Sequence, residues 1–209
     1  MESSLPLVVM VDSDASLRQS LAQRLRAEGL RVVEFANAEE CVQHSLPRDV
    51  ACLLLDLQMP GMDGIALQDW ATSAQPGLPV VFLTGHGDVR CGVEAMKRGA
   101  FDFLLKPADD AAVLATLRRA IDERSAMRLQ LQQRDDIQER HASLTSRERE
   151  VMRMMVRGRL NKQIAADLGI SVKTVKVHRA RALEKMGVRS VAALVHACYS
   201  GGIQGFTLH

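Results

Sequence analysis

Long apolar runs are missing from this sequence. No stretch approaches the ~18 residues that a membrane-spanning helix needs, so we expect no membrane partner. Cysteine is sparse, and the four residues (Cys41, Cys52, Cys91 and Cys198) match no zinc or redox spacing. We therefore expect reduced thiols in a cytoplasmic protein. Residues 1–6 lead straight into a predicted strand, which argues against a secretory signal.

Glycine and proline are absent from residues 108–157. A stretch without these residues favours helix, and a continuous helix over 109–141 would be about 50 Å long. The polar segment 123–141 is predicted to be a helical linker. A semi-rigid arm, a coiled coil that pairs two protomers and a frayed connection are the alternatives for it.

The net charge of +2 conceals two halves of opposite sign. Residues 1–124 hold 12 Lys and Arg against 18 Asp and Glu, whereas residues 142–209 hold 12 against 4. This asymmetry predicts two domains with different partners, the second partner being a polyanion. We place the first domain at residues 1–122 and the second at residues 142–209.

Strand and helix signals alternate five times in the first domain. Short apolar runs end near Val11, Phe35, Leu55, Thr84 and Leu105, and a helical pattern follows each. Five such units predict an α/β doubly wound, five-stranded parallel sheet. The carboxyl ends of parallel strands meet at one edge of such a sheet, where ligands bind.

Polar side chains gather at that predicted edge: Asp12, Ser13 and Asp14 after the first strand, Asp56 after the third, Thr84 at the end of the fourth and Lys106 at the end of the fifth. The acids could hold Mg²⁺, which prefers oxygen ligands. Asp56 could attack a phosphorus atom while Lys106 and Thr84 neutralise the phosphoryl oxygens. From its position alone, Asp56 could also be a metal ligand, a general base or a helix cap.

A longer motif decides between these roles. Asp56-x-x-Met59-Pro60-Gly61-x-Asp63-Gly64, with Thr84 and Lys106-Pro107, resembles the receiver domain of bacterial response regulators. The run from Thr84 to Asp88, Thr-Gly-His-Gly-Asp, resembles the FixJ branch. The resemblance implies a flavodoxin-like fold in which a sensor histidine kinase phosphorylates Asp56.

The resemblance also implies the roles of the surrounding residues. Lys106 and Thr84 would contact the phosphoryl group, Phe103 would be an aromatic switch, and Mg²⁺ would contact Asp12, Asp56 and the Gln58 carbonyl. Ser13 departs from the family pattern, which has a second acid after Asp12; in the family that second acid is the direct metal ligand, so Ser13 stands in its place. Because a hydroxyl is a poorer Mg²⁺ ligand than a carboxylate, we expect a weakened Mg²⁺ affinity, partly restored by Asp14.

Capped short helices are predicted in the basic second domain. Thr145 and Glu148 have the spacing of a capping box. Asn161 is predicted to cap the next helix and Ser171 the one after it, with a three-residue turn between them. This spacing predicts a small all-α domain with a helix-turn-helix.

The helix predicted over residues 172–186 has cations on one side and apolar residues on the other, which suits a helix in the DNA major groove. Leu144-Thr145-x-Arg147-Glu148 and the run Thr174–His178, Thr-Val-Lys-Val-His, resemble the LuxR-type helix-turn-helix domain. The resemblance implies that this helix reads DNA. The predicted DNA-binding residues are Lys173, Thr174, Lys176, Val177, Arg179, Arg181 and Lys185.

The two resemblances predict a two-component transcription regulator of the bacterial cytoplasm and not an enzyme. Phosphorylation of Asp56 would control homodimerisation and sequence-specific binding to double-stranded promoter DNA, with RNA polymerase as a candidate further partner. Two alternatives remain. Asp12-x-Asp14-x-Ser16 resembles the nucleophile motif of haloacid-dehalogenase-like phosphatases, and Ser13 favours a regulator that works without phosphorylation.

Overall fold

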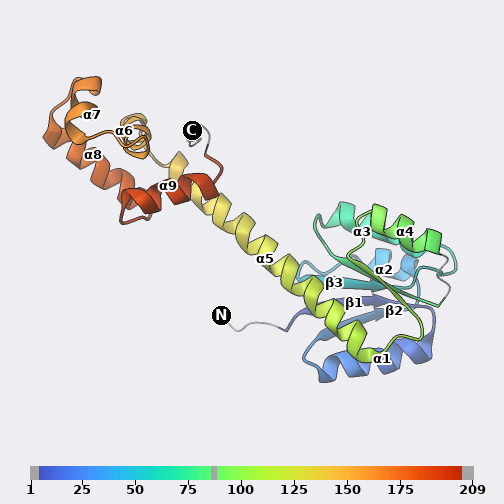
Figure 1. Cartoon of the computed structure of the whole chain (residues 1–209). Coiled ribbons are helices and arrows are strands. Elements are labelled where there is room, and N and C mark those ends of the chain that lie inside the picture. Colours follow the sequence, from blue (N-terminus) through green and yellow to red (C-terminus); the bar gives the residue numbers. More distant parts are fainter. Residues whose placement is uncertain (1–4, 86–88, 204–209) are drawn as a thin grey trace. The chain divides into compact units, whose positions relative to one another are not determined.

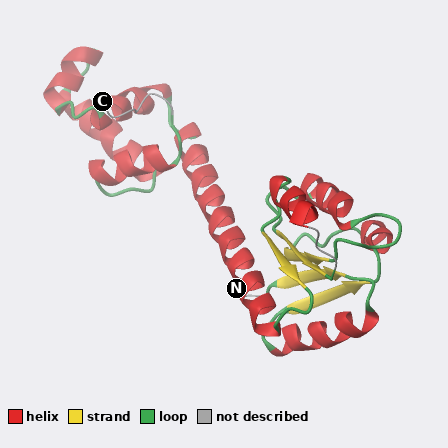
Figure 2. Ribbon diagram, turned by 45° about the vertical axis from the view of Figure 1, so that its right-hand side comes forward, coloured by secondary structure: helices red, strands yellow, loops and turns green. Residues whose placement is uncertain are grey.

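The computed structural model describes residues 5–85 and 89–203. It divides into two compact units, Met1–Met127 and Arg128–His209. Strands lie in the first unit, whereas the described part of the second is helical (Figure 2). Every helix within residues 5–85 and 89–203 is too short or too polar to span a membrane.

A five-stranded parallel sheet forms the centre of the first unit within the described residues. Its strands are β1 (Leu7–Val11), β2 (Arg31–Phe35), β3 (Val50–Leu55), β4 (Val80–Thr84) and β5 (Asp102–Leu105). They are ordered β2-β1-β3-β4-β5, and every neighbouring pair is parallel. Residues of β1 and β4 are buried throughout, as expected for strands covered on both faces. The predicted doubly wound sheet is confirmed.

Helices cover both faces of the sheet (Figure 1). They are α1 (Ala15–Ala27), α2 (Ala38–His44), α3 (Gly64–Ala74), α4 (Val89–Lys97) and α5 (Asp110–Ala142). Leu25 of α1 and Leu117 of α5 belong to the core on one face. Cys41 of α2, Leu67 of α3 and Ala95 of α4 belong to the core on the other. The sheet therefore holds its carboxyl edge rigidly between two packed layers.

The second unit is built from helices that surround a core of Val151, Met152, Ile164, Val175 and Leu194, among others. They are α6 (Ser146–Val156), α7 (Asn161–Leu168), α8 (Val172–Lys185) and α9 (Val191–Ser200). The α5 helix is one continuous helix of 33 residues that begins in the first unit and ends in the second. The polar segment 123–141 is thus helical throughout.

The start of α7 differs from the sequence-based expectation. Asn161, predicted to be the cap, is instead the first helical residue, and Leu160 occupies the cap position. The side chain of Gln163 accepts a hydrogen bond from the backbone N–H of Leu160 at 2.9 Å. In a capping box, this hydrogen bond runs from the backbone of the cap residue to the side chain three residues later. It needs no polar side chain on the cap residue, so Leu160 can occupy the cap position in place of Asn161.

The last turns of α5 pack inside the second unit. The Gln138 side chain donates to the Gly201 carbonyl at 3.1 Å, and Arg140 donates to the Met186 carbonyl at 3.4 Å. A methyl group on Gly201 would collide with the side chain of Ile137. The C-terminal end of α5 is therefore an integral part of this unit's packing.

Candidate phosphorylation site and DNA-binding face

Three charged side chains meet at the carboxyl edge of the sheet. Asp12 follows β1, Asp56 follows β3 and Lys106 follows β5. The Lys106 ammonium donates to Asp12 Oδ2 at 2.6 Å and to Asp56 Oδ2 at 3.1 Å. Burial disfavours the charge on this ammonium, but the hydrogen bonds and charges of the two carboxylates outweigh it and raise the pKa of Lys106 above its usual value. Both acids are buried, and the pairing with Lys106 offsets the cost of burying their charges.

Backbone hydrogen bonds fix the positions of these residues. The N–H of Asp56 donates to the Val11 carbonyl at 2.8 Å, and the N–H of Lys106 donates to the Thr84 carbonyl at 2.8 Å. Thr84 is fully buried, yet its hydroxyl has no hydrogen-bond partner among the described residues. A buried polar atom left unpaired costs about 1–3 kcal/mol. The site therefore contains an unpaired hydroxyl on the residue whose backbone carbonyl accepts from the Lys106 N–H.

The donor set at this edge fits a Mg²⁺ ion that retains several waters. Asp12 and Asp56 offer two carboxylates, and magnesium sites commonly combine one or two carboxylates with substrate phosphate oxygens. Asp14 does not add a third, because its side chain caps α1 by accepting from the N–H groups of Ser16 and Leu17. Among the described residues, no group of three acidic, histidine or cysteine side chains is arranged to hold a metal.

The loop after β3 packs tightly against Asp56. A Cβ on Gly64 would collide with the Asp56 carbonyl oxygen and lie 2.9 Å from the ring of Phe82. Asp63 caps α3 by accepting from the Ala66 N–H at 2.8 Å. The glycine and the acid of the motif thus hold the loop close to the sheet. Gln58 is exposed in this loop, two residues after Asp56.

Phe103 lies between the sheet and α4. It pairs with Phe82 in the register of β4 and β5 and packs, half-buried, against the core on this face. Its ring is 3.4 Å from the position that a Cβ on Gly92 would occupy. The placement connects β5 to α4, and the switch role of Phe103 stays a prediction.

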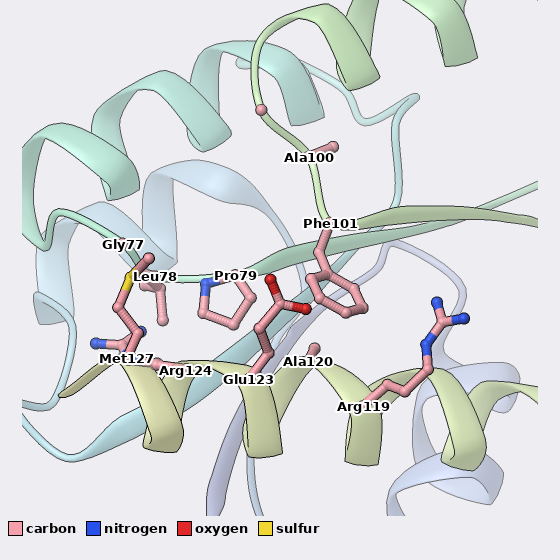
Figure 3. A pocket seen from close by; sticks show the side chains of 11 residues that line it. Gly77, Leu78, Pro79, Ala100, Phe101, Arg119, Ala120, Glu123, Arg124 and Met127 are labelled. Carbon is pink, nitrogen blue, oxygen red and sulfur yellow. The ribbon is translucent and has the colours of Figure 1, made fainter. Parts of the chain in front are cut away.

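Figure 3 shows a cavity at the other end of the sheet. Its volume is about 700 Å³, and it lies near the amino ends of β4 and β5, where Pro79 and Phe101 face Arg119, Glu123 and Met127 of α5. None of the predicted site residues lines it. The site at the carboxyl edge of the sheet is therefore separate from this cavity.

The α8 helix presents a basic face in the second unit. Lys173, Lys176, Val177 and Arg181 are exposed, whereas Thr174 and Arg179 are partly buried. Their spacing places the exposed side chains along one face, because residues three and four apart neighbour each other on a helix. The Thr174 hydroxyl shares a hydrogen bond with the Ser171 hydroxyl at 2.8 Å, at the start of the helix.

Lys185, the last predicted DNA-binding residue, is engaged within the fold. Its ammonium donates to Glu148 Oε2 at 2.7 Å, and the same carboxylate accepts from the Thr145 N–H at 2.9 Å. The hydrogen bond from Lys185, followed by that from Thr145, lowers the pKa of Glu148 to about 2. The predicted capping box is confirmed, and Lys185 stabilises this unit through Glu148.

Arg18 contacts the site but was not among the predicted residues. Its side chain donates to the backbone carbonyl of Asp12 at 2.6 Å. Its only signal in the sequence is its place six residues after Asp12, early in a predicted helix. A bond from a side chain to a backbone oxygen has no residue pattern that a sequence could reveal.

Two family models match the chain. The response regulator receiver domain matches residues 8–118, and the model of bacterial regulatory proteins of the luxR family matches residues 142–198. Transcriptional regulatory protein FixJ of Azorhizobium caulinodans is 40% identical over 203 residues, covering 97% of this chain and 96% of the relative. Nodulation protein W of Bradyrhizobium diazoefficiens is 38% identical over 205 residues, covering 96% of this chain and 88% of the relative.

Two solved structures also match over most of this chain. The response regulator StyR aligns with a TM-score of 0.83 and 42% identity over 93% of this chain and 98% of the other. Full-length FixJ from B. japonicum aligns with a TM-score of 0.59 and 36% identity over 96% of this chain and 98% of the other. A receiver joined to this DNA-binding domain implies a histidine kinase and DNA as partners, and a regulator rather than a phosphatase. The chain belongs to the two-component response regulators that combine a receiver domain with a LuxR-type DNA-binding domain and regulate transcription.

Proposed function

We propose that this regulator is switched when Asp56 accepts a phosphoryl group from a sensor histidine kinase. The observation that carries the proposal is the sheet edge, where Lys106 joins Asp56 to Asp12 and a buried Thr84 hydroxyl lacks a partner among the described residues. A nucleophilic carboxylate, a cation and a hydroxyl donor are groups that can together support phosphoryl transfer.

In the proposed reaction, an Asp56 oxygen attacks the phosphorus of the kinase's phosphohistidine. The phosphorus–nitrogen bond breaks, its electron pair leaves with the histidine, and an acyl phosphate forms on Asp56. Lys106 then exchanges its hydrogen bond with the Asp56 carboxylate for one with a phosphoryl oxygen, and Thr84 donates to another. Mg²⁺ held by Asp12, Asp56 and the Gln58 carbonyl would neutralise phosphoryl charge.

We expect the magnesium affinity to be weak for a site of this kind. Ser13 is exposed and offers a neutral hydroxyl, and the Asp14 carboxylate is committed to the cap of α1. Mg²⁺ would therefore be bound by two carboxylates only. A third would strengthen its binding, since Mg²⁺ prefers charged oxygen ligands.

Phosphorylation is proposed to shift an existing equilibrium of the first unit toward a form that pairs two chains. Exposed apolar side chains on α4 and β5 support such a surface: Val93 and Met96 are each 46% exposed and Leu105 is 56% exposed. A homodimer would supply two α8 helices for two half-sites of a promoter.

The exposed face of α8 supports sequence-specific DNA binding. Lys173 and Arg181 are proposed to contact phosphates, while Lys176 and Val177 face base edges in the major groove. Phosphate contacts of this type make binding strongly dependent on salt. The proposal places this activity in the bacterial cytoplasm, with RNA polymerase as a further partner at the promoter.

The test uses the full chain incubated with acetyl phosphate and Mg²⁺. We expect mass spectrometry to place a single added phosphoryl group on Asp56, light scattering to show an increase in dimer, and affinity for a duplex obtained by in vitro selection to rise. Asp56→Asn is the matched control and should show none of these changes. Phosphorylation that leaves both dimerisation and DNA affinity unchanged would contradict the proposed switch.

A second candidate function follows from Ser13, which weakens the case for a magnesium-dependent site. In it, the receiver unit acts as a fixed interaction module and DNA binding is independent of phosphorylation. The same experiment, together with a measurement of promoter activation in cells, separates the two. This candidate predicts no phosphoryl group on Asp56 and equal promoter activation in cells by the wild type and Asp56→Asn.

A further inference from the structure

Arg18 of α1 reaches from its helix to the end of β1. Its Nη1 donates to the backbone carbonyl of Asp12 at 2.6 Å, and its side chain is 15% exposed. The Arg18 Nε lies 4.0 Å from a carboxylate oxygen of Glu34 in β2, and Arg26 holds the other oxygen of that carboxylate at 2.8 Å. Glu34 thus places a negative charge beside Arg18, while Arg18 donates a hydrogen bond to the Asp12 backbone.

Every hydrogen-bonding group of Asp12 is engaged. Its N–H donates to the Phe35 carbonyl at 3.2 Å, and Oδ1 accepts from the Asp14 N–H at 2.9 Å. Oδ2 accepts from Lys106 at 2.6 Å, and the carbonyl accepts from Arg18. Among these, the bond from Arg18 comes from a flexible side chain without a role in the phosphorylation chemistry. The hydrogen bond from Arg18 therefore serves to hold the Asp12 backbone in place.

The position of Asp12 matters more here than it would beside a second acid. Ser13 carries no charge, and the Asp14 carboxylate faces the first turn of α1. Asp12 is consequently the single carboxylate that the turn after β1 directs to Lys106. A metal ligand has to be held within about 0.5 Å of its productive position, which requires support from neighbouring residues.

We propose that Arg18, with Glu34 as a nearby counter-ion, is a positioning residue that fixes Asp12 for Mg²⁺ at the phosphorylation site. The inference rests on the proposed function, because it assigns support for the same site. Removing residues that orient metal ligands commonly weakens metal affinity by about 10- to 100-fold. Since Asp12 retains its three other hydrogen bonds, we expect the lower end of that range for Arg18→Met.

The experiment compares full-length Arg18→Met, Arg18→Lys and Glu34→Gln with the wild type, and Arg24→Met on the exposed side of α1 is the control. Calorimetry measures Mg²⁺ affinity, and acetyl phosphate gives the rate of Asp56 phosphorylation against Mg²⁺ concentration. Amide exchange of Asp14, measured without metal, reports whether its bond to Asp12 has loosened.

We expect Arg18→Met to bind Mg²⁺ about tenfold more weakly, with a normal phosphorylation rate once Mg²⁺ is saturating and faster exchange of the Asp14 amide. Arg18→Lys should restore part of the affinity, and Glu34→Gln should weaken it by a smaller factor in the same direction. Where Arg18→Met fails to fold, these two variants decide.

Magnesium affinities within twofold of the wild type in the folded variants would overturn the role of Arg18. A loss of rate that persists at saturating Mg²⁺, with unchanged affinity, would assign Arg18 to the fold alone and also overturn it. If the wild type neither binds Mg²⁺ nor becomes phosphorylated, the proposed function itself fails and the inference fails with it. The behaviour of the wild type therefore distinguishes the two failures.

Discussion

The pair formed by Glu148 and Lys185 allows a test of what stabilises the DNA-binding unit. Glu148 is 3% exposed and accepts hydrogen bonds from Lys185 at 2.7 Å and from the Thr145 N–H at 2.9 Å. Glu148→Gln preserves the shape of the side chain and an oxygen that can still accept from Thr145. The substitution therefore removes mainly the charge that faces Lys185.

The size of the effect follows from the geometry. A hydrogen bond to a charged group contributes about 1.5–3 kcal/mol when it is sheltered. Lys185 is 35% exposed, so water screens part of the interaction. We expect Glu148→Gln to lower the free energy of unfolding of the second unit by about 1–2 kcal/mol near pH 7.

The difference should depend on pH in a known direction. The pKa of Glu148 is lowered from 4.5 to about 2 in the folded chain, so its contribution is complete above pH 4.5 and is lost as the pH falls toward 2. Protonated glutamate and glutamine then interact with Lys185 alike. The stability gap between the wild type and Glu148→Gln should therefore close between pH 5 and pH 2.

Urea unfolding followed by circular dichroism measures this gap, and fluorescence of Trp70 isolates the first unit because the chain has a single tryptophan. Glu150→Gln is the control: Glu150 pairs with Arg147 on the exposed side of the same helix and should contribute under about 1 kcal/mol. A gap that stays constant as the pH falls, or an equal loss in Glu150→Gln, would refute the reasoning.

Three further substitutions test the packing and the metal site. Ser13→Asp adds a carboxylate beside the predicted magnesium ligands and should tighten Mg²⁺ binding about tenfold, measured by calorimetry. Gly64→Ala places a Cβ against the backbone of the loop after β3 and should destabilise the first unit by about 1–3 kcal/mol in the Trp70 transition. Gly201→Ala places a methyl group against Ile137 and should destabilise the second unit by about 1–3 kcal/mol, measured by circular dichroism.

Different results would contradict each expectation. Equal magnesium affinities before and after Ser13→Asp would show that the missing acid is not limiting. An unchanged Trp70 transition in Gly64→Ala would show that the loop yields without cost. Gly201→Ala should change the unfolding of the second unit, measured by circular dichroism, and leave the Trp70 transition of the first unit unchanged. The opposite result would contradict the predicted contact with Ile137.

The sheet could be predicted because buried parallel strands are apolar on both faces and therefore appear as short, dense runs. The first apolar run, predicted to end near Val11, ends where β1 ends. A helix start is harder to predict where the cap residue has no polar side chain. At the start of α7, Leu160 is the cap residue, and its N–H donates to the Gln163 side chain. The absence of glycine and proline indicated helix for α5, but nothing in the sequence showed that Ile137 packs beneath Gly201.

The site residues were predictable only to the extent that strand order brings them together. Asp56 and Lys106 lie 50 residues apart and meet because parallel strands end at one edge. The contact between Arg18 and the Asp12 carbonyl depends on how α1 is rotated against the sheet, which periodicity does not determine. The Glu148–Lys185 pair likewise depends on the crossing of α6 and α8.

Some cations of this chain form ion pairs within the fold and others do not. Lys106 faces two carboxylates and Lys185 faces one, so the charge of each is used within its own unit. Lys173, Lys176 and Arg181 carry no ion pair in the described part of the chain and stand exposed along α8, whose one acid, Glu184, lies near its end. A polyanion is drawn to charges that no internal acid neutralises. The proposed DNA-binding face of α8 therefore keeps positive charge available to a polyanion, which residue type alone does not reveal.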